Sequence, residues 1–239
     1  MHSAKLIGVR HHNDKIASFD FKAPKGFRYQ AGQFVEVQLD HQPADDRGDQ
    51  RWFSLSSAPH EPHLSISTRI DGQPLSSFKQ QLINLPLGDT SVRLSDPMGD
   101  FVLPRTDTLP LVFLVAGIGM APVRAVTTAA KHACRRPEAY LWYAVADKRD
   151  VVFLDEISDL FTSCTIIEGT RQFRDSNRTT SRLALADVTA QLPAKVINNC
   201  LYYIAGPDQF VADLKTQLEQ SGVEQSRLVT DYFGNYDSI

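Results

Sequence analysis

In the first part of the chain, hydrophobic and polar residues alternate in short runs separated by turn-forming residues. An alternation with a period of two is typical of β-strands that bury one face. About six short strands separated by turns predict a small antiparallel β-barrel or sandwich. The runs occupy residues 5–9, 16–21, 35–39, 64–70, 91–94 and 101–103, and a further run begins at Arg51.

After a polar stretch at residues 104–108 the pattern changes. Nearly unbroken hydrophobic runs now alternate with segments whose hydrophobic residues recur at the spacing of a helix. Such runs are typical of strands buried on both faces, and strands alternating with helices indicate a parallel sheet covered by helices. The sequence therefore predicts an α+β, two-domain fold: an antiparallel β-barrel over residues 1–105 and an α/β domain with a parallel sheet over residues 106–239. The runs of the second half are residues 109–115, 139–145, 165–167 and 201–204.

One strand of the first half carries the sequence Arg-Trp-Phe-Ser at residues 51–54. On a strand, Arg51 and Phe53 point to one face, while Trp52 and Ser54 point to the other. A guanidinium beside a flat ring suits a ligand with a phosphate at one end and an aromatic system at the other. An ordinary strand with one exposed arginine explains the same residues.

Ser76 is a candidate N-cap, because Phe78 and Leu82 follow it at helical spacing. The free backbone N–H groups of such a first turn can bind a phosphate. A capped helix that only closes the barrel is the alternative.

A glycine-rich turn, Ala-Gly-Ile-Gly-Met-Ala-Pro at residues 116–122, joins the first hydrophobic run of the second half to a predicted helix. Glycines let a ligand approach the backbone closely, and a helix N-terminus attracts an anion. The pattern is G-x-G-x-x-P and lacks the third glycine of the dinucleotide fingerprint. Because parallel strands end at one edge of a sheet, this loop and Gly206-Pro207 should face a common crevice.

In their order and spacing, six motifs resemble those of the ferredoxin–NADP⁺ reductase superfamily over nearly the full length of the chain. Three residues depart from the common forms: Ala116 replaces the first Gly of G-G-x-G, Ala205 replaces the Cys before Gly-Pro, and Phe53 replaces the commoner Tyr. The motifs are Ala-Gly-Gln-Phe at 31–34, R-x-[YF]-S at 51–54, the second flavin loop at 72–76, the G-P-x-G-x-F-like turn at 96–101, the nicotinamide-dinucleotide loop at 117–122 and the strand end at 205–207.

The resemblance implies a flavin-binding barrel followed by an NAD(P)-binding domain, with FAD and NAD(P)H as the cofactors. It implies that Arg51 pairs with the flavin phosphate, that Phe53 stacks against the isoalloxazine, and that Ser54 hydrogen-bonds near flavin N5 as a catalytic residue. The other cofactor-binding candidates that it implies are Trp52, Thr68, Arg69, Gly72, Leu75, Ser76, Ser77, Gly117, Ile118, Gly119, Pro122, Gly206 and Pro207.

Three aromatic residues lie close together near the C-terminus, and some family members cover the far face of the flavin with such a residue. Tyr236 is the catalytic candidate of this kind, although Tyr232 or Phe233 would also serve. For Phe233 a last strand anchored by core aromatics is the preferred interpretation. Asp231 stands where many members have a Glu near N5.

Residues 170–182 are the most basic stretch of the chain, with Arg171 followed by three further arginines. NADP-preferring relatives place hydroxyl and arginine groups for the 2′-phosphate where Thr170 and Arg171 stand here, and arginine suits a phosphate dianion. A solvated loop explains the composition equally well. We therefore expect NADPH in preference to NADH.

The net charge of −3 gives no reason to expect a nucleic-acid partner. Cys134, Cys164 and Cys200 are widely spaced, which excludes a sequence-local zinc knuckle or four-cysteine iron–sulfur motif. No metal site is expected. An odd, sparse cysteine count, no apolar signal region and no membrane-spanning run together predict a cytoplasmic protein.

The predicted function is an FAD-dependent NAD(P)H oxidoreductase that passes electrons to a small redox protein of the ferredoxin or flavodoxin type. One alternative is an NAD(P)H:flavin reductase, which uses flavin as a substrate. A second alternative is an electron-transfer subunit of a larger complex.

Overall fold

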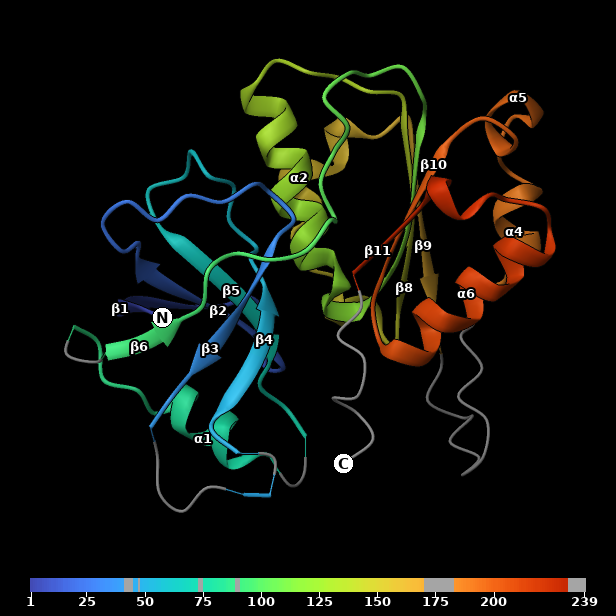
Figure 1. The fold of residues 1–239 in the computed structure, drawn as a ribbon. Coiled ribbons are helices and arrows are strands. Elements are labelled where there is room, and N and C mark those ends of the chain that lie inside the picture. Colours follow the sequence, from blue (N-terminus) through green and yellow to red (C-terminus); the bar gives the residue numbers. More distant parts are fainter. Residues whose placement is uncertain (41–44, 47, 73–74, 89–90, 170–182, 232–239) are drawn as a thin grey trace.

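The computed structural model describes residues 1–40, 45–46, 48–72, 75–88, 91–169 and 183–231. Figure 1 shows two sheets side by side, the first built from the N-terminal part of the chain and the second from the C-terminal part. Helix α2 (Met120–His132) lies between them.

The N-terminal sheet is antiparallel and closes into a barrel. In the described part of the chain its strand order is β4-β3-β6-β1-β2-β5, and an isolated bridge from Leu55 to Ile66 joins the end of β4 to β5. Helix α1 (Ser77–Ile83) buries Phe78 and Leu82 against the barrel, so the capped helix predicted after Ser76 is confirmed. The strands are β1 (His2–His11), β2 (Ile16–Lys22), β3 (Phe34–Gln38), β4 (Gln50–Ser54), β5 (Leu64–Arg69) and β6 (Ser91–Leu94).

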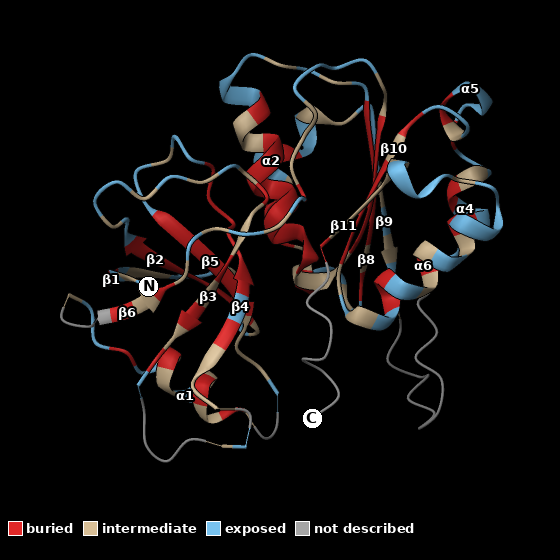
Figure 2. Ribbon diagram, in the orientation of Figure 1, coloured by how far each residue is buried: buried red, intermediate tan, exposed pale blue. Residues whose placement is uncertain are grey.

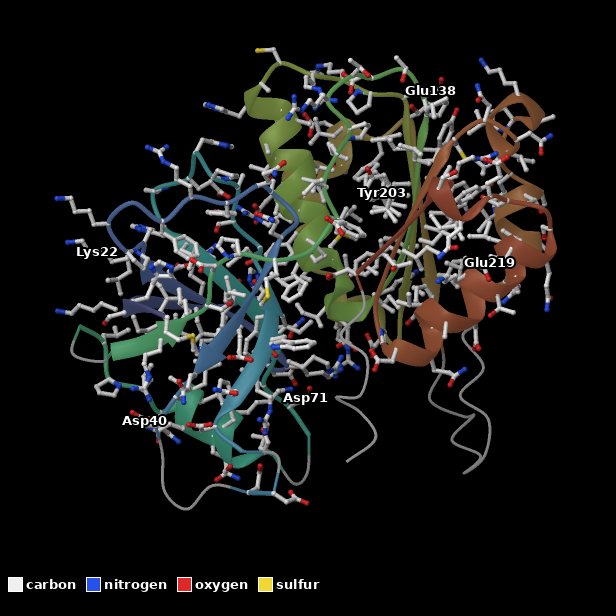
Figure 3. The ribbon with its side chains drawn as sticks, viewed as in Figure 1. Lys22, Asp40, Asp71, Glu138, Tyr203 and Glu219 are labelled. Carbon is white, nitrogen blue, oxygen red and sulfur yellow. The ribbon has the colours of Figure 1, made fainter. Side chains whose placement is uncertain are left out.

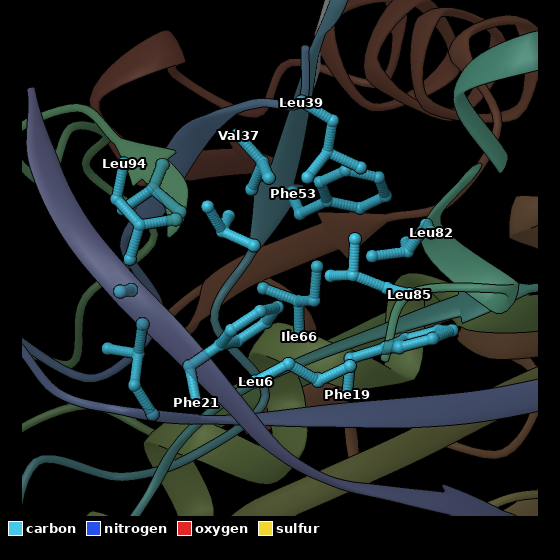
Figure 4. Packing of buried hydrophobic residues seen from close by; sticks show 14 of the residues in the cluster. Leu6, Phe19, Phe21, Val37, Leu39, Phe53, Ile66, Leu82, Leu85 and Leu94 are labelled. Atoms are coloured by element: carbon cyan, nitrogen blue, oxygen red, sulfur yellow. The ribbon is translucent and has the colours of Figure 1, made fainter. Parts of the chain in front are cut away.

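Inward-facing residues of these strands fill the barrel interior, which Figure 4 shows at close range. Phe19 and Phe21 from β2 meet Ile66 from β5 and Val37 from β3, and all four side chains are buried. The burial of each such side chain contributes about 1.5–3 kcal/mol. The alternation read from the sequence is therefore the alternation between core and surface.

The C-terminal sheet is parallel, with the order β11-β10-β7-β8-β9 among the described strands. Its strands and the helices around it confirm the predicted alternation of strand and helix. The strands are β7 (Leu111–Ala116), β8 (Ala139–Val145), β9 (Ser163–Glu168), β10 (Leu201–Ala205) and β11 (Leu228–Asp231), and the helices besides α2 are α3 (Leu154–Ile157), α4 (Leu185–Thr189), α5 (Ala194–Ile197) and α6 (Asp208–Gln220).

Both faces of the central strands β7, β8 and β10 are covered, as Figure 2 shows by the buried strands between the helices, whereas the described residues of the edge strand β9 are largely exposed. Phe113 and Val115 of β7 pack in the core that includes residues of α2. Val112 and Leu114 pack on the other face, in the core that includes residues of α4, α5 and α6. The unbroken hydrophobic run of β7 is thus explained by burial on both sides.

Residues 101–103 do not form the predicted strand. The Phe101 ring inserts into the core of the parallel sheet and meets Tyr203 edge-on at 5.1 Å. The Tyr203 hydroxyl donates a hydrogen bond to the Val102 carbonyl at 2.8 Å. These contacts tie the stretch to the second sheet in place of a partner strand. The domain boundary between residues 105 and 106 stays a prediction; it falls between the end of β6 and the start of β7.

Arg124 on α2 fixes the two sheets relative to each other. Its buried guanidinium donates hydrogen bonds to the Ser56 carbonyl at 2.8 Å and to both Glu61 oxygens at 2.8 and 2.9 Å. It also donates to Glu156 at 2.9 Å. Ser56 and Glu61 follow β4, which carries the Arg51–Ser54 motif, and Arg124 follows the glycine turn. The contacts of Arg124 with Ser56 and Glu61 therefore hold these two predicted cofactor-binding segments at a fixed distance from each other.

Candidate functional site

A cleft of about 400 Å³ lies between the barrel and the C-terminal edge of the parallel sheet. This volume is in the usual range for sites that bind cofactors and other small molecules. The barrel contributes the ends of β4 and β5 and the start of α1, and the parallel sheet contributes the ends of β7, β10 and β11. The lining residues are Arg51, Trp52, Phe53, Ser54, Ser67, Thr68, Arg69, Ser76, Lys79, Ala116, Gly117, Ile118, Gly119, Ala121, Gly206, Pro207, Asp208 and Asp231.

The two glycine loops of the parallel sheet approach each other at backbone distance. A Cβ atom on Gly119 would lie 2.5 Å from the Ala205 carbonyl carbon and oxygen, so only glycine fits there. Gly117 has a φ of +52°, and a Cβ atom added there would meet no non-neighbouring heavy atom within 4 Å. Both loops line the same cleft, as expected from the shared edge of the strands.

Arg51 places a cation at the barrel end of the cleft. Its guanidinium lies 5.2 Å from the centre of the Phe78 ring and donates hydrogen bonds to the Gln50 carbonyl at 2.6 Å and the Gly48 carbonyl at 3.2 Å. Its second amino group lies 3.5 Å from the Asp45 carboxylate. The guanidinium is therefore held by the loop that precedes β4.

Lys79 is a second cation in the cleft lining, and the sequence analysis missed it. It follows Ser76 by three residues, and a spacing of three places two side chains on the same face of a helix. Ser76 caps the helix, because its hydroxyl accepts the Lys79 backbone N–H at 3.3 Å. The three-residue spacing from Ser76 is the sequence signal that could have identified Lys79. Asp208, which directly follows Gly206-Pro207, was missed as well.

Phe53 and Arg51 share one face of β4, since both contact the ring of Phe78. Phe53 is only 9% exposed and lies among the core residues labelled in Figure 4. The centre of its ring is 5.9 Å from that of Phe78. A small part of Phe53 therefore reaches the cleft, and its stacking role stays a prediction. Trp52 is 36% exposed, and its indole N–H donates to Glu36 at 3.0 Å.

Ser54 and Asp231 form a buried pair across the cleft. The Ser54 hydroxyl donates to the Asp231 carboxylate at 2.5 Å, although the two residues are 177 positions apart. Each residue is 7% exposed. Burial raises the pKa of Asp231 to about 7, and the hydrogen bond from Ser54 offsets only part of this effect. A carboxyl group with such a pKa can hold or release a proton near neutral pH.

Arg69 reaches the cleft from the end of β5, and acidic residues surround it. It donates two hydrogen bonds to Asp71, labelled in Figure 3, at 3.0 and 2.6 Å, and lies 3.9 Å from Asp150. Asp150 is buried and also pairs with Lys15 at 2.6 Å. Arg69 therefore connects the cleft lining to the contact between the two sheets.

The remaining sequence-based candidates lie apart from the cleft lining or outside the described residues. Gly72, Leu75, Ser77 and Pro122 are described but do not line the cleft. Thr170, Arg171 and Tyr236 lie outside the described residues. The functional roles expected of all these residues stay predictions.

The residues of the cleft fit a flavin. Arg51 and Lys79 bring positive charge to the barrel side of the cleft lining, and Ser76 and Thr68 bring hydroxyl groups, a combination that suits a phosphate. On the side of the parallel sheet, glycine backbone and the Ile118 side chain form a surface that a flat ring can approach. In the described part of the chain, no group of three or more His, Cys, Asp or Glu side chains is arranged to hold a metal ion. The described helices include none with the length and apolar character of a membrane span.

No protein-family model matches the chain. A flavohemoprotein from Deinococcus radiodurans is 28% identical over 221 residues, which cover 88% of this chain and 53% of the relative. A ferredoxin–NADP reductase from Pseudomonas aeruginosa is 33% identical over 130 residues, which cover 53% of this chain and 47% of the relative. The chain thus spans about half the length of the curated relatives that it matches.

Two solved structures have the same arrangement of barrel and parallel sheet. The flavohem-like FAD/NAD-binding domain of nitric oxide dioxygenase from Vibrio cholerae O1 biovar El Tor superposes with a TM-score of 0.74 at 22% identity, covering 97% of this chain and 98% of that one. A ferredoxin NADP⁺ reductase from Neisseria gonorrhoeae, solved with bound FAD and NADP, gives 0.72 at 19% identity, covering 96% and 97%. These matches show that the two-sheet fold is shared over the whole chain.

Proposed function

We propose that this chain, which is similar in sequence to a flavohemoprotein and to a ferredoxin–NADP reductase and shares its fold with two FAD- and NAD(P)-binding proteins, is an FAD-dependent NAD(P)H oxidoreductase of the ferredoxin–NADP⁺ reductase superfamily. It moves a hydride from nicotinamide to flavin and then passes electrons to a small redox protein of the ferredoxin or flavodoxin type. The observation that carries the proposal is the single cleft that Arg51 and Ser54 of the barrel share with Gly117 and Gly206 of the parallel sheet.

Each side of the cleft binds one of the two ligands in this proposal. On the barrel side, Arg51 and Lys79 attract the flavin phosphate, and Phe53 contributes apolar surface to the ring. On the other side, the backbone around Gly117 receives the dinucleotide, since no Cβ blocks its approach there, and Gly119 allows the Ala205–Gly206 backbone to pack closely behind it. When bound, the flavin supplies the two-electron chemistry. The protein contributes the close alignment of the two rings.

Asp231 controls the direction in which Ser54 donates its proton. When Asp231 is ionised, the Ser54 hydroxyl is committed to the carboxylate at 2.5 Å. When Asp231 is protonated, its own O–H can donate to the Ser54 oxygen, and the Ser54 proton is then available to a ligand. Burial raises the pKa of Asp231 to about 7, so both arrangements are populated near neutral pH.

Reduction of the purified, FAD-loaded protein by NADPH and by NADH tests the proposal directly. Stopped-flow absorbance should show the flavin band bleaching with at least one nicotinamide, and the product should reduce an added ferredoxin or flavodoxin. A flavin band that neither nicotinamide bleaches would refute the oxidoreductase assignment. Bleaching without transfer to either protein would refute only the acceptor.

An NAD(P)H:flavin reductase, which binds flavin as a substrate, is the second candidate. The position of Asp45 beside Arg51 supports it, because a carboxylate there weakens the attraction for a flavin phosphate. Protein that loses its yellow colour on desalting would favour this candidate over tightly bound FAD.

NADPH is the proposed electron donor, on the basis of Thr170 and Arg171 in the basic stretch. The proposed location is the cytoplasm, which the sparse cysteines support.

A further inference from the structure

Asp45 lies against the cationic end of the cleft and is fixed by two hydrogen bonds to a single residue. Its carboxylate accepts the Ser77 backbone N–H at 2.8 Å, and its own N–H donates to the Ser77 hydroxyl at 2.9 Å. Its other carboxylate oxygen lies 3.5 Å from the Arg51 guanidinium. The Asp45 side chain is 25% exposed and that of Arg51 is 9% exposed. Water therefore screens this pair of charges only in part.

The guanidinium of Arg51 turns toward this same loop. Its hydrogen bonds to the Gln50 and Gly48 carbonyls use one amino group, and the second amino group is the one nearest Asp45. An anion that approaches this second amino group from the cleft thus meets a guanidinium whose charge is already balanced by a carboxylate of the chain. A phosphate there must share Arg51 with Asp45 or displace it.

We propose that Asp45 is a specificity-determining residue that competes with the phosphate of a flavin for the Arg51 guanidinium. The proposal rests on the proposed function, because it assumes that the flavin phosphate approaches Arg51. Asp45 lowers the affinity for phosphate-bearing flavins such as FMN and leaves the affinity for riboflavin, which has no phosphate, nearly unchanged. The preference between flavins is thus set by a charge beside the cleft as well as by the residues that line it.

The physical reason is the repulsion between like charges at short range. A phosphate in contact with Arg51 lies within a few ångströms of the Asp45 carboxylate, and two anions at this distance in a partly buried setting repel each other strongly. Riboflavin makes the same ring contacts but brings no charge. The ratio of the two dissociation constants therefore isolates the effect of Asp45 on the phosphate.

The test is a fluorescence titration of the purified protein with riboflavin and with FMN, in the wild type, Asp45→Asn and Asp49→Asn. An asparagine at position 45 keeps an oxygen that accepts the Ser77 N–H but removes the charge. Asp49 belongs to the same loop, and its carboxylate accepts a hydrogen bond from Gln38 at 2.9 Å. Asp49→Asn is therefore a matched control for the change in net charge.

We expect Asp45→Asn to lower the Kd for FMN about tenfold while it changes the Kd for riboflavin less than about twofold. Asp45→Ser, a second variant without the charge, should act in the same direction. The difference should shrink in high salt. Equal ratios of the two constants in wild type, Asp45→Asn and Asp49→Asn would overturn this inference alone, as would a gain shared equally by both flavins. If FAD bound but neither FMN nor riboflavin bound to any of the proteins, this inference alone would fall; if FAD failed to bind as well, the proposed function would fall with it.

Discussion

Replacing Asp231 by asparagine should stabilise the protein at alkaline pH and have little effect at acidic pH. The pKa of Asp231 is raised from 3.8 in the unfolded reference to about 7, chiefly by burial. Between these two values the folded protein binds more protons than the unfolded chain, so the unfolding free energy falls as the pH rises and levels off above about pH 7. Asparagine has the same shape and cannot ionise.

The expected size of this pH-dependent change in unfolding free energy follows from the difference between the folded and unfolded pKa values of Asp231. Each unit is worth about 1.4 kcal/mol, so the unfolding free energy of the wild type should fall relative to Asp231→Asn by about 3 kcal/mol between pH 5 and pH 8. Urea unfolding of both proteins at several pH values measures this difference. Other titrating groups are common to the two proteins and cancel in the comparison.

Ser54→Ala provides the control for the hydrogen bond. The Ser54 hydroxyl donates to the carboxylate and lowers the pKa of Asp231, so its removal should raise this pKa further. Carbon-13 NMR of the carboxyl groups would follow the titration directly. A stability difference between wild type and Asp231→Asn that is the same at pH 5 and pH 8 would refute the argument, because it would mean that Asp231 titrates normally.

Three further predictions concern the two sheets and the donor. Gly119→Ala places a Cβ 2.5 Å from the Ala205 backbone, so it should cost about 2 kcal/mol of stability and weaken NADPH binding. The control Gly117→Ala meets no such contact and should cost about 1 kcal/mol because of its φ of +52°. Equal losses of stability in the two variants would contradict the packing argument. Arg124→Met removes a buried cation that joins the sheets and should cost about 3 kcal/mol in thermal or urea unfolding; a loss below about 1 kcal/mol would show that the ion pair is not needed. Arg171→Ala should raise the Michaelis constant for NADPH far more than that for NADH in steady-state assays; equal changes would remove the argument for NADPH.

The pattern of residues along the chain determined both sheets. The period-two alternation predicted the barrel because one face of each strand packs into its interior. The unbroken run in β7 predicted a doubly covered parallel sheet, since Phe113 and Leu114 must both be buried on opposite faces. Short sequence motifs also predicted Arg51, Ser54 and Gly117 as site residues, and all three line the cleft. Such motifs can be recognised because their residues are close together in the sequence. The same reasoning failed for residues 101–103, which look like a strand but pack as a loop.

Contacts between distant parts of the chain were decided only by the tertiary structure. Ser54 meets Asp231 across 177 positions, and the raised pKa of Asp231 comes from burial at that meeting point. Phe53 turns mainly into the barrel core, because Phe78 offers it an apolar neighbour there. Asp45 balances the charge of Arg51 through a loop whose course has no sequence signature. The hydrophobic pattern of a sequence indicates which apolar side chains must be buried. The burial of a charged side chain depends instead on which distant segments of the chain pack against it.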